Sequence, residues 1–586
     1  MSFQVSPGVE TREIDLTNVI PAVSTAIGAI AGAYNWGPVE KIVTVNSEKN
    51  LTDEFGTPDS RTAKYFFPAA QFLRYSNTLR VVRAEQVGMF NATPLADVED
   101  EESATPILIK NTEDFETKTF TFGQEFIAKY PGELGNSIAV VLVSNETAFN
   151  DETVSIGTAD SELLIRDLFD FAPSTTDFAD RANISGDELH IVVIDLLGAI
   201  TGVPGTILET FQGLSQASDA KKEDGTANFY KDVINRSSRY VWAGATPSSI
   251  PLAGLPTTSA NLNIPVASDD TNYTTSDTAD LFVFGGGSNG DEDLPVLGEL
   301  INAYDLYRNT EATDVSFIIG VDDEVNDTTL ANELINLAED RRDAVAFVSP
   351  SSSRTANNIN AFNDVLDFAS DITSSSYGVI DSGAVYVYDK YNDVFRFVIA
   401  AGDVAGLCAN TDSVADPWFS PAGFNRGQLR GVTRLAFNPN KSQRDDLYKA
   451  RINPIVSFPG EGTVLFGDKT ALSRPSAFDR INVRRLFIVL QKAISTAAQF
   501  QLFELNDEFT RAQFRSLVEP FLREVQGRRG ITDFKLVCDD TNNTAEVVDS
   551  NRFIADIYIK PARSINFITL NFVAVRTGVE FSEITG

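Results

Sequence analysis

Short apolar runs alternate with amphipathic helical patterns between residues 281 and 388. The apolar runs are Leu281–Phe284, Val315–Gly320, Ala344–Val348 and Ala384–Tyr388. Apolar side chains recur at helical spacing between them, as in Leu297, Leu300 and Tyr304, in Leu330, Leu334 and Leu337, and in Phe362, Val365 and Ala369. Strands that are apolar throughout and that alternate with helices predict a parallel sheet with helices on both faces.

The length of the chain requires several domains. At 586 residues it is too long for one hydrophobic core, so we expect three or four domains. Hydrophobic residues make up 43% of the chain and aromatic residues 10%. This composition excludes a disordered protein and allows several substantial cores.

The first 95 residues predict an arm followed by a strand, a helix and a second strand. Residues 1–22 show no helical pattern and read as an arm, with a frayed terminus as the alternative. The small apolar residues of Ser24–Ala33 are typical of a buried strand. Ser60–Tyr75 predicts a helix that Pro68 can kink, and Leu79–Val82 predicts a strand.

Residues 95–275 have a different character, because strands and Asp, Thr, Asn and Gly turns dominate. Leu189–Asp195 and Thr206–Phe211 predict a hairpin with a long loop. The acidic run Asp97–Glu102 is interpreted as a solvated loop, since it lacks the ligand spacing of a calcium site. We expect one or two β-rich modules here.

A basic block near the end of the chain stands out against an acidic whole. Residues 425–535 hold 19 Lys and Arg against 11 Asp and Glu, whereas the whole chain has 47 against 82. The block indicates a surface that meets an acidic surface. Its helical patterns run through Val483, Leu486 and Leu490 and through Phe514, Val518 and Phe521, with Pro520 as a first-turn residue or a kink. Ile531–Cys538, Phe553–Ile559 and Ile565–Val575 predict strands, so the block is a small α+β domain.

No catalytic, cofactor or metal site is predicted. The single histidine, His190, lies in a strand pattern and reads as a partly exposed strand residue. No nucleophile motif accompanies it. Gly285–Gly290 follows an apolar run but lacks the Lys and Ser/Thr of a phosphate-binding loop, so a turn is expected. Cys408 and Cys538 are far apart in sequence and are expected to be buried free thiols.

The net charge and the hydropathy of the chain restrict the partners that it can bind. A net charge of −35 and a pI near 4.4 argue against nucleic acid, because phosphates would be repelled over most of the surface. The N-terminus shows no signal-peptide pattern, and Val19–Tyr34 is too short and too interrupted to span a membrane. We therefore expect a protein made in a cytoplasm, with no direct membrane insertion.

Short motifs follow one another in a fixed order along the chain. In the N-terminal part they are Ser6–Val9, Asp15–Thr17, Ala31–Gly32, Trp36–Val39, Phe55–Pro58 and Leu79–Arg83. Further along they are Tyr130–Asn136, Thr201–Gly205 with Glu209, Gly285–Gly287, Ala344–Pro350, Pro417–Gly423, Arg480–Arg485, Phe503–Asn506 and Phe553–Ala555. Each motif is weak alone, but their order covers nearly the whole chain. In this order they resemble the tail-sheath proteins of contractile-tailed phages (myoviruses), particularly the large multidomain kind.

The resemblance implies a multidomain architecture. A subtilisin-like three-layer α/β domain would span 280–478, and the segment 23–95 would pack with it. Residues 96–185 would form an outer β-rich insertion, and 186–279 a further β-rich domain. Residues 479–586 would form a small α+β domain that faces the tail tube and is joined by the N-terminal arm, 1–22. A protease site would need a histidine in the α/β domain, and His190 lies outside it.

The resemblance also implies function and partners: a structural virion subunit that forms a helical homo-oligomer of stacked hexameric rings around the tail tube. Contraction would drive the tube through the host envelope for genome ejection, with baseplate and tail terminator proteins as further partners. Strand exchange between subunits would use Phe3, Val5, Val9, Ile568, Leu570, Phe572 and Val573. The tube contact would use Glu519, Arg523, Arg528 and Arg529, with a solvated helix end as the alternative for these four.

Two other functions remain open from the sequence. A phage-derived injection device, such as a tailocin or a secretion-type machine, would use a sheath with the same mechanics. A hydrolase on a subtilisin-like scaffold belongs to a different class. The position of His190, the missing signal peptide and the acidic multidomain layout argue against the hydrolase.

Overall fold

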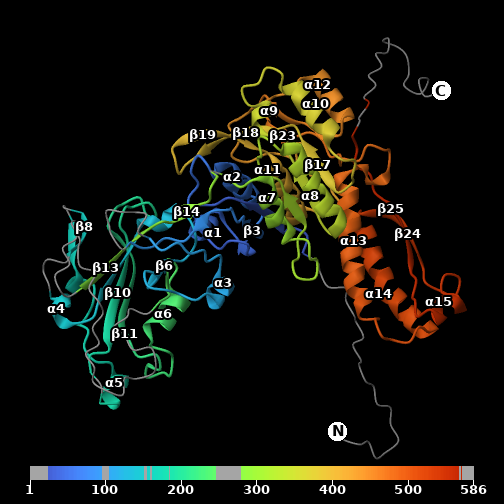
Figure 1. The fold of residues 1–586 in the computed structure, drawn as a ribbon. Coiled ribbons are helices and arrows are strands. Elements are labelled where there is room, and N and C mark those ends of the chain that lie inside the picture. Colours follow the sequence, from blue (N-terminus) through green and yellow to red (C-terminus); the bar gives the residue numbers. More distant parts are fainter. Residues whose placement is uncertain are drawn as a thin grey trace, which may run out of the picture.

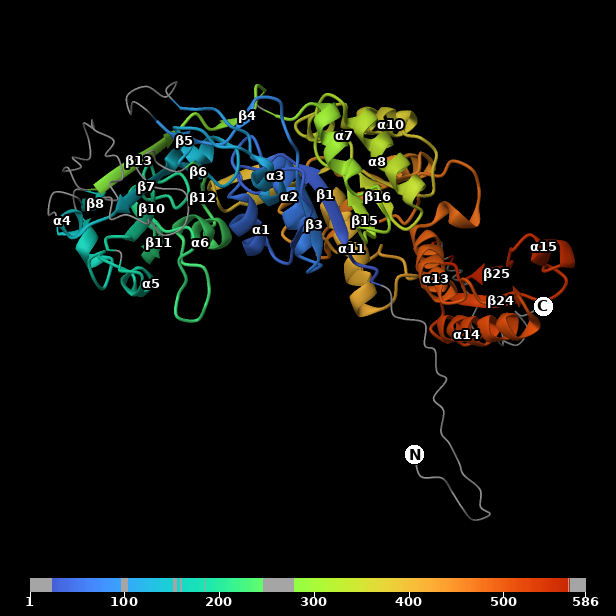
Figure 2. The same cartoon turned by 60° about the horizontal axis from the view of Figure 1, so that its bottom comes forward.

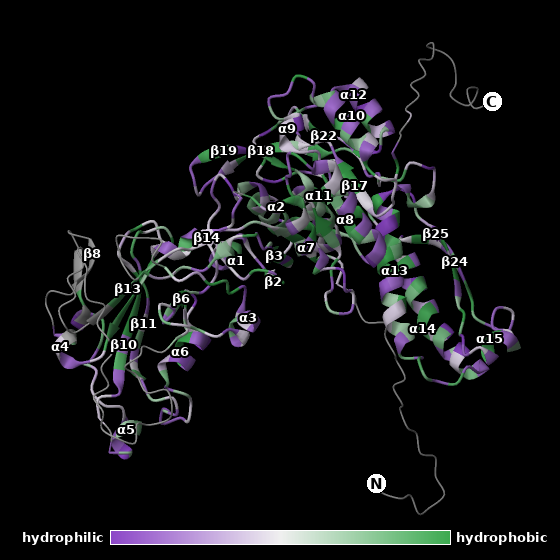
Figure 3. Ribbon diagram, in the orientation of Figure 1, coloured by the Kyte–Doolittle hydropathy of each residue, from purple (hydrophilic) through white to green (hydrophobic). Residues whose placement is uncertain are grey.

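The computed structural model describes residues 24–95, 104–150, 155–158, 161–183, 185–245, 279–292, 294–566 and 569. It is a mixed α/β protein with several sheets (Figure 1). A β-rich unit lies at one end, an α/β unit in the middle, and a pair of long helices with a small sheet at the other end. The hydrophobic strands lie inside these units and the hydrophilic segments outside (Figure 3).

The central unit is built on a seven-stranded sheet that is parallel except at one edge. Its order is β2-β3-β1-β15-β16-β17-β21, and only β2 runs antiparallel to its neighbour. The strands are β1 (Gly28–Gly32), β2 (Val43–Val45), β3 (Leu79–Arg83), β15 (Phe317–Ile319), β16 (Val345–Val348), β17 (Gly378–Asp381) and β21 (Ile452–Asn453). The parallel sheet predicted from the alternating pattern is therefore present, and the N-terminal strands β1 and β3 belong to it.

Helices cover both faces of this sheet. The connections β1–α2–β3 and β15–α8–β16 step in opposite directions along the sheet, so right-handed crossovers place α2 and α8 on opposite faces. Figure 2 shows α7, α8 and α10 on one side of β15 and β16, and α11 on the other. The helices are α2 (Ala63–Leu73), α7 (Leu297–Asp305), α8 (Asp327–Arg341), α10 (Ala361–Asp371) and α11 (Ala401–Val414).

Glycines in β1 explain the small-residue run of the sequence. A Cβ added to Gly28 would lie 2.7 Å from the ring of Phe72, and one added to Gly32 would lie 2.6 Å from Tyr65. Both aromatic side chains come from α2, which packs against β1. The residues of β1 therefore have small side chains because α2 lies directly against the backbone of this strand.

The β-rich unit contains a five-stranded antiparallel sheet of order β11-β10-β7-β13-β5. Its strands are β5 (Thr93–Pro94), β7 (Ile138–Val143), β10 (Glu188–Asp195), β11 (Thr206–Ser215) and β13 (Ala279–Gly285). The predicted hairpin is β10–β11. Leu281–Phe284, expected as the first strand of the α/β part, instead pairs with β7 in this sheet. A boundary at residue 185 would separate β7 from β10, which are hydrogen-bonded neighbours.

The expectation that His190 is partly exposed was wrong. Its side chain is fully buried among the rings of Phe149, Phe169 and Phe171. Nε2 donates to the carbonyl oxygen of Phe171 at 2.8 Å, and Nδ1 accepts from the backbone N–H of Gly213 at 3.1 Å. With both nitrogens bonded to backbone groups, this histidine holds the core of the β-rich unit together.

A second strand was assigned to the wrong sheet. Ala384–Tyr388 corresponds to β18 (Ala384–Asp389), which pairs antiparallel with β19 (Val394–Ile399) and β20 (Arg434–Leu435). The seventh strand of the parallel sheet is β21, which the sequence pattern did not predict. Alternation alone did not reveal that the chain leaves the sheet after β17 and returns only at Ile452.

The C-terminal unit is an antiparallel helix pair with a two-stranded sheet: α13 (Ile481–Gln499), α14 (Glu508–Gly527), β24 (Ile531–Val537) and β25 (Asp556–Pro561). The helices and both strands were predicted, and Pro520 lies inside α14 rather than in its first turn. The third predicted strand, Ile565–Val575, lies almost entirely outside the described residues, and its described residues 565, 566 and 569 are not in a strand. Cys408 and Cys538 are buried free thiols, as predicted.

Shorter elements complete the described part of the chain. The helices are α1 (Glu48–Phe55), α3 (Thr112–Thr117), α4 (Glu146–Phe149), α5 (Asp177–Arg181), α6 (Tyr230–Ser237), α9 (Ser352–Thr355), α12 (Lys441–Lys449) and α15 (Ala545–Asp549). The strands are β4 (Met89–Phe90), β6 (Phe126–Ala128), β8 (Ser155–Thr158), β9 (Ser161–Leu164), β12 (Val241–Ala243), β14 (Ser288–Asn289), β22 (Ile455–Phe458) and β23 (Gly462–Leu465). None of the helices in the described ranges is long and apolar enough to cross a membrane.

A buried carboxyl group in α11 makes stability depend on pH. Burial raises the pKa of Asp403 from 3.8 to about 7. The folded protein therefore holds this proton more tightly than the unfolded chain, and the free energy of unfolding falls as the pH rises from about 4 to about 7. We expect Asp403→Asn to reduce the loss between pH 5 and pH 8 by at least about 1.4 kcal/mol, the equivalent of one pKa unit. Urea unfolding at both pH values measures it, and equal losses in the two proteins would contradict it.

Candidate functional site: the joint and cleft beside the C-terminal helices

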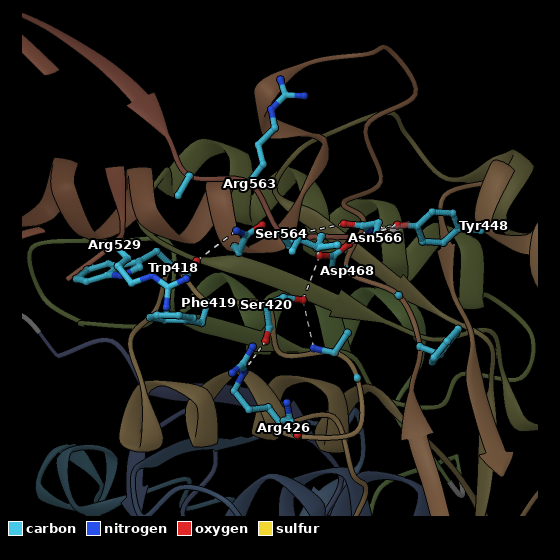
Figure 4. A pocket seen from close by; sticks show the side chains of 18 of the residues that line it. Trp418, Phe419, Ser420, Arg426, Tyr448, Asp468, Arg529, Arg563, Ser564 and Asn566 are labelled. Atoms are coloured by element: carbon cyan, nitrogen blue, oxygen red, sulfur yellow. Dashed lines mark hydrogen bonds between the residues drawn. The ribbon is translucent and has the colours of Figure 1, made fainter. Parts of the chain in front are cut away.

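A cleft of about 1040 Å³ lies where the α/β unit meets the start of α13 and the end of α14 (Figure 4). Its apolar lining includes Trp418, Phe419, Phe466 and Ile531. The charged residues that line it are five cations, Arg426, Lys441, Arg444, Arg529 and Arg563, and two carboxylates, Asp445 and Asp468. The cleft is thus apolar and cationic in a chain whose net charge is −35.

Asp468 is the polar centre of the cleft. Its buried carboxylate accepts hydrogen bonds from Arg480 at 3.2 Å, from Ser420 at 3.1 Å and from Ser564 at 2.9 Å. Asn566 Nδ2 donates to the same carboxylate at 3.1 Å. These partners come from three chain segments, so Asp468 ties residues 564–566 to the α/β unit.

Three of the lining cations have no acidic partner among the described residues. Lys441, Arg529 and Arg563 are exposed, and none lies within ion-pair distance of a carboxylate in these ranges. The guanidinium of Arg426 donates to the Ser420 carbonyl, and Arg444 stacks on the rings of Phe458 and Phe466. Positive charge is therefore available to an anionic partner.

The first turns of α13 form a buried joint with the α/β unit. Arg485 Nη2 donates to both carboxylate oxygens of Asp412, at 2.6 and 2.7 Å, and Nη1 donates to the carbonyl oxygen of Cys408 at 3.2 Å. Both side chains are nearly fully buried. Burial raises the pKa of Asp412, while the charge and hydrogen bonds of Arg485 favour its ionised form.

Neighbouring contacts extend the joint along α13 and α14. Arg484 lies between the rings of Tyr377 and Phe478, 4.2 and 4.1 Å from their centroids, and donates to Ser376 Oγ at 2.6 Å. Further along α13, Lys492 pairs with Asp314 of the α/β unit. At the end of α14, Arg528 pairs with Asp416.

The four predicted tube-contact residues are near one another on α14 and just after it, but they differ in surroundings. Arg523 is 71% exposed and makes a loose pair with Glu519 at 3.8 Å. Arg528 is bound to Asp416, pairs with Glu524 at 3.7 Å and lies over Trp418. Arg529 lines the cleft. The predicted strand-exchange residues, Phe3, Val5, Val9, Ile568, Leu570, Phe572 and Val573, lie outside the described residues.

The sequence interpretation of the basic block missed the joint. We expected a basic surface, yet Arg480, Arg484 and Arg485 all make contacts with the α/β unit or the segment leading into α13. A signal was present: Arg484 and Arg485 lie within Ile481–Leu490, which is apolar on nearly every side, and a helix that is apolar all round is buried.

Gly285–Gly290 was predicted as a turn, but it contains the short strand β14, and Gly287 packs against residues 132–136. The Gly287 N–H donates to Asn136 Oδ1 at 2.7 Å, and Asn136 Nδ2 donates to the Gly287 carbonyl at 3.0 Å. A Cβ on Gly287 would lie 2.6 Å from the carbonyl oxygen of Gly132.

Within the described ranges, no group of three or more His, Cys, Asp or Glu residues is arranged to hold a metal ion.

These features define a multidomain α/β protein whose C-terminal helix pair is joined to the α/β unit by a buried ion pair. Residues 306–471 match the protein family described as "phage tail sheath protein central domain". Residues 473–574 match the family described as "phage tail sheath C-terminal domain". Residues 25–84 match the family described as "tail sheath protein Gp18 domain III N-terminal region". The joint thus lies between two of the matched domains.

Whole-chain comparisons agree. The tail sheath protein of Vibrio phage KVP40 is 34% identical, covering 99% of this chain and all of that protein. The tail sheath protein of Enterobacteria phage T4 is 32% identical, covering 99% of each. The solved sheath tail protein of Listeria innocua matches with a TM-score of 0.53 and 13% identity, covering 93% of each chain. The chain belongs to the phage tail sheath protein family and is a virion structural component.

The buried ion pair of the joint can be tested by removing one partner and then both. Arg485→Met leaves the Asp412 carboxylate buried and unpaired, so we expect a loss of about 3–5 kcal/mol in the free energy of unfolding. The double variant Arg485→Met/Asp412→Leu removes both charges and should recover most of the loss. Urea unfolding measures each variant. A single variant as stable as the native protein would show that the pair does not stabilise the joint.

Proposed function

We propose that this chain is the subunit of a contractile tail sheath that polymerises helically around a tail tube and contracts during genome delivery. The observation that carries the proposal is its similarity, over nearly the full length of both chains, to the tail sheath proteins of phages KVP40 and T4. Its partners are further copies of itself in stacked hexameric rings, the tube protein, and baseplate and tail terminator proteins. Assembly takes place in the host cytoplasm, and no catalytic step is involved.

The buried joint supports a mechanical role. A sheath subunit must pass force from its lattice contacts to the tube without unfolding, and contraction moves whole subunits between two packings. Arg485, Arg484 and Lys492 fasten α13 to the α/β unit, so the helix pair and the sheet move together. We further propose that the α/β unit has subtilisin-like layering, with the helices on both faces of the seven-stranded sheet in its support.

The small C-terminal sheet supports strand exchange between subunits. β24 and β25 pair only with each other among the described strands, so each has an open edge. A two-stranded sheet is marginal by itself, and strands from neighbouring copies would extend it. The arm residues Phe3, Val5 and Val9 and the C-terminal residues Ile568, Leu570, Phe572 and Val573 are the proposed contributors.

Electron microscopy tests self-assembly and the arm together. Negative-stain images of the purified protein should show long, striated, hollow tubes. Deletion of residues 1–19 should leave a folded monomer with unchanged thermal unfolding but no tubes, because the exchanged strand is lost. Compact particles at every concentration of the full chain would count against a sheath, and normal tubes from the truncated chain would rule out arm exchange.

We also propose that α14 contacts the tube, through Glu519, Arg523, Arg528 and Arg529. Arg523 is the best residue for a test, since its side chain is exposed and held only by a loose pair. Arg528 would disturb the joint if it were reversed, because it is bound to Asp416.

Arg523→Glu should lower sheath assembly on purified tubes at least tenfold while leaving tubeless self-assembly unchanged, since a reversed charge at a contact repels the partner. Co-sedimentation with tubes measures the first quantity, and turbidity without tubes the second. Arg474→Glu is the matched control, because Arg474 is also exposed and has no ion pair in the described ranges. Equal tube binding by both variants would remove Arg523 from the contact.

A further inference from the structure

The loop between α13 and α14 presents an apolar surface to solvent. Phe500, Leu502, Phe503, Leu505 and Phe509 are between 63% and 105% exposed. We call these five side chains the knob. Large apolar side chains gathered on one short loop mark an interaction site rather than scattered surface residues.

Polar contacts hold the knob in shape. Asn506 Nδ2 donates to the carbonyl oxygen of Arg552 at 2.8 Å, and Arg511 donates to Asn506 Oδ1 at 3.1 Å. The carboxylate of Asp507 caps α14 by accepting from the Thr510 N–H at 2.8 Å. Phe503 adopts a φ of 70°, in the left-handed region that costs a non-glycine residue free energy. The loop is therefore held in a conformation that turns its apolar side chains outward.

The segment that carries the knob is also acidic. Residues 500–509 contain Glu504, Asp507 and Glu508 and no Lys or Arg. None of the three carboxylates forms an ion pair with a described residue. The partner of the knob should therefore combine an apolar surface with positive charge.

The cleft has these properties. Trp418, Phe419, Phe466 and Ile531 supply apolar surface. Its five lining cations exceed its two lining carboxylates by three, which matches the three carboxylates of the knob. Its volume of about 1040 Å³ slightly exceeds the range of about 300–1,000 Å³ of pockets that hold small ligands, so it has room for several side chains.

The knob cannot enter the cleft of its own chain. Asn482, at the start of α13, lines the cleft, whereas the knob follows the last residue of the same helix, Gln499. Seventeen residue steps of α13, at about 1.5 Å each, separate Asn482 from Gln499 by about 26 Å. Figure 1 shows α13 and α14 extending away from the central sheet.

We infer that the knob inserts into the cleft of a second copy of this chain, as a head-to-tail contact. Different surfaces of the two copies meet in such a contact, and its repetition generates rings or open helical filaments. The inference deepens the proposed self-assembly by naming a contact formed by side chains, separate from strand exchange. Lys441 and Arg563 would receive Glu504 and Glu508 of the neighbour.

Cysteine cross-linking tests the contact directly. A Phe503→Cys variant and an Arg563→Cys variant, mixed under mild oxidation, should give a disulfide-linked dimer that neither variant gives alone. Cys408 and Cys538 are buried, so the background is low. Ile359→Cys, at a site 98% exposed on the α/β unit, replaces Phe503→Cys as the control and should give no dimer. Absence of the dimer from the Phe503–Arg563 mixture would overturn the inference.

Charge reversal provides a second measurement. Glu504→Lys/Glu508→Lys and Lys441→Glu/Arg563→Glu should each raise the critical concentration for polymerisation at least tenfold, and combining all four substitutions in one chain should restore it. An unchanged critical concentration in both double variants would also overturn the inference. Cross-linking requires only contact between copies, so a dimer without tubes would support the knob contact while contradicting the proposed sheath function.

Discussion

The position of the C-terminal helices depends on one buried ion pair, between Arg485 and Asp412. Two charges removed from water are costly unless each is fully satisfied. Here the guanidinium reaches both carboxylate oxygens and the Cys408 carbonyl, which fixes the angle at which α13 leaves the α/β unit. Arg484, Lys492 and the pair of Arg528, at the end of α14, with Asp416 add further contacts along both helices.

The contacts of the joint divide the cations of the basic block into two groups. The inward group stabilises the joint within one chain, and its members are buried or paired. The outward group lines the cleft, and Lys441, Arg529 and Arg563 lack acidic partners in the described ranges. In a chain of net charge −35, cations left unpaired beside an apolar cleft indicate contact with another acidic surface. We propose that this surface belongs to a second copy of the chain.

Much of the fold followed from local pattern, and the errors have a common cause. Periodicity identified four strands of the parallel sheet, β1, β3, β15 and β16, and both long helices, because each exposes one face or none to solvent. It placed Leu281–Phe284 and Ala384–Tyr388 in the wrong sheet, since an apolar run shows that a strand is buried but not which strand it pairs with. The predicted exposure of His190 was wrong for the same reason, because the phenylalanine rings that bury it come from other segments.

The sequence by itself determined the elements, the acidic balance and the family, because periodicity, composition and ordered motifs are properties of the chain in one dimension. Only the tertiary structure decided which arginines fasten the joint and which face the cleft. Arg485 and Asp412 are 73 residues apart, and Asp468 collects partners up to 98 residues away. Whether a charge is buried and paired depends on such contacts, which form only when the sheet has brought distant segments together.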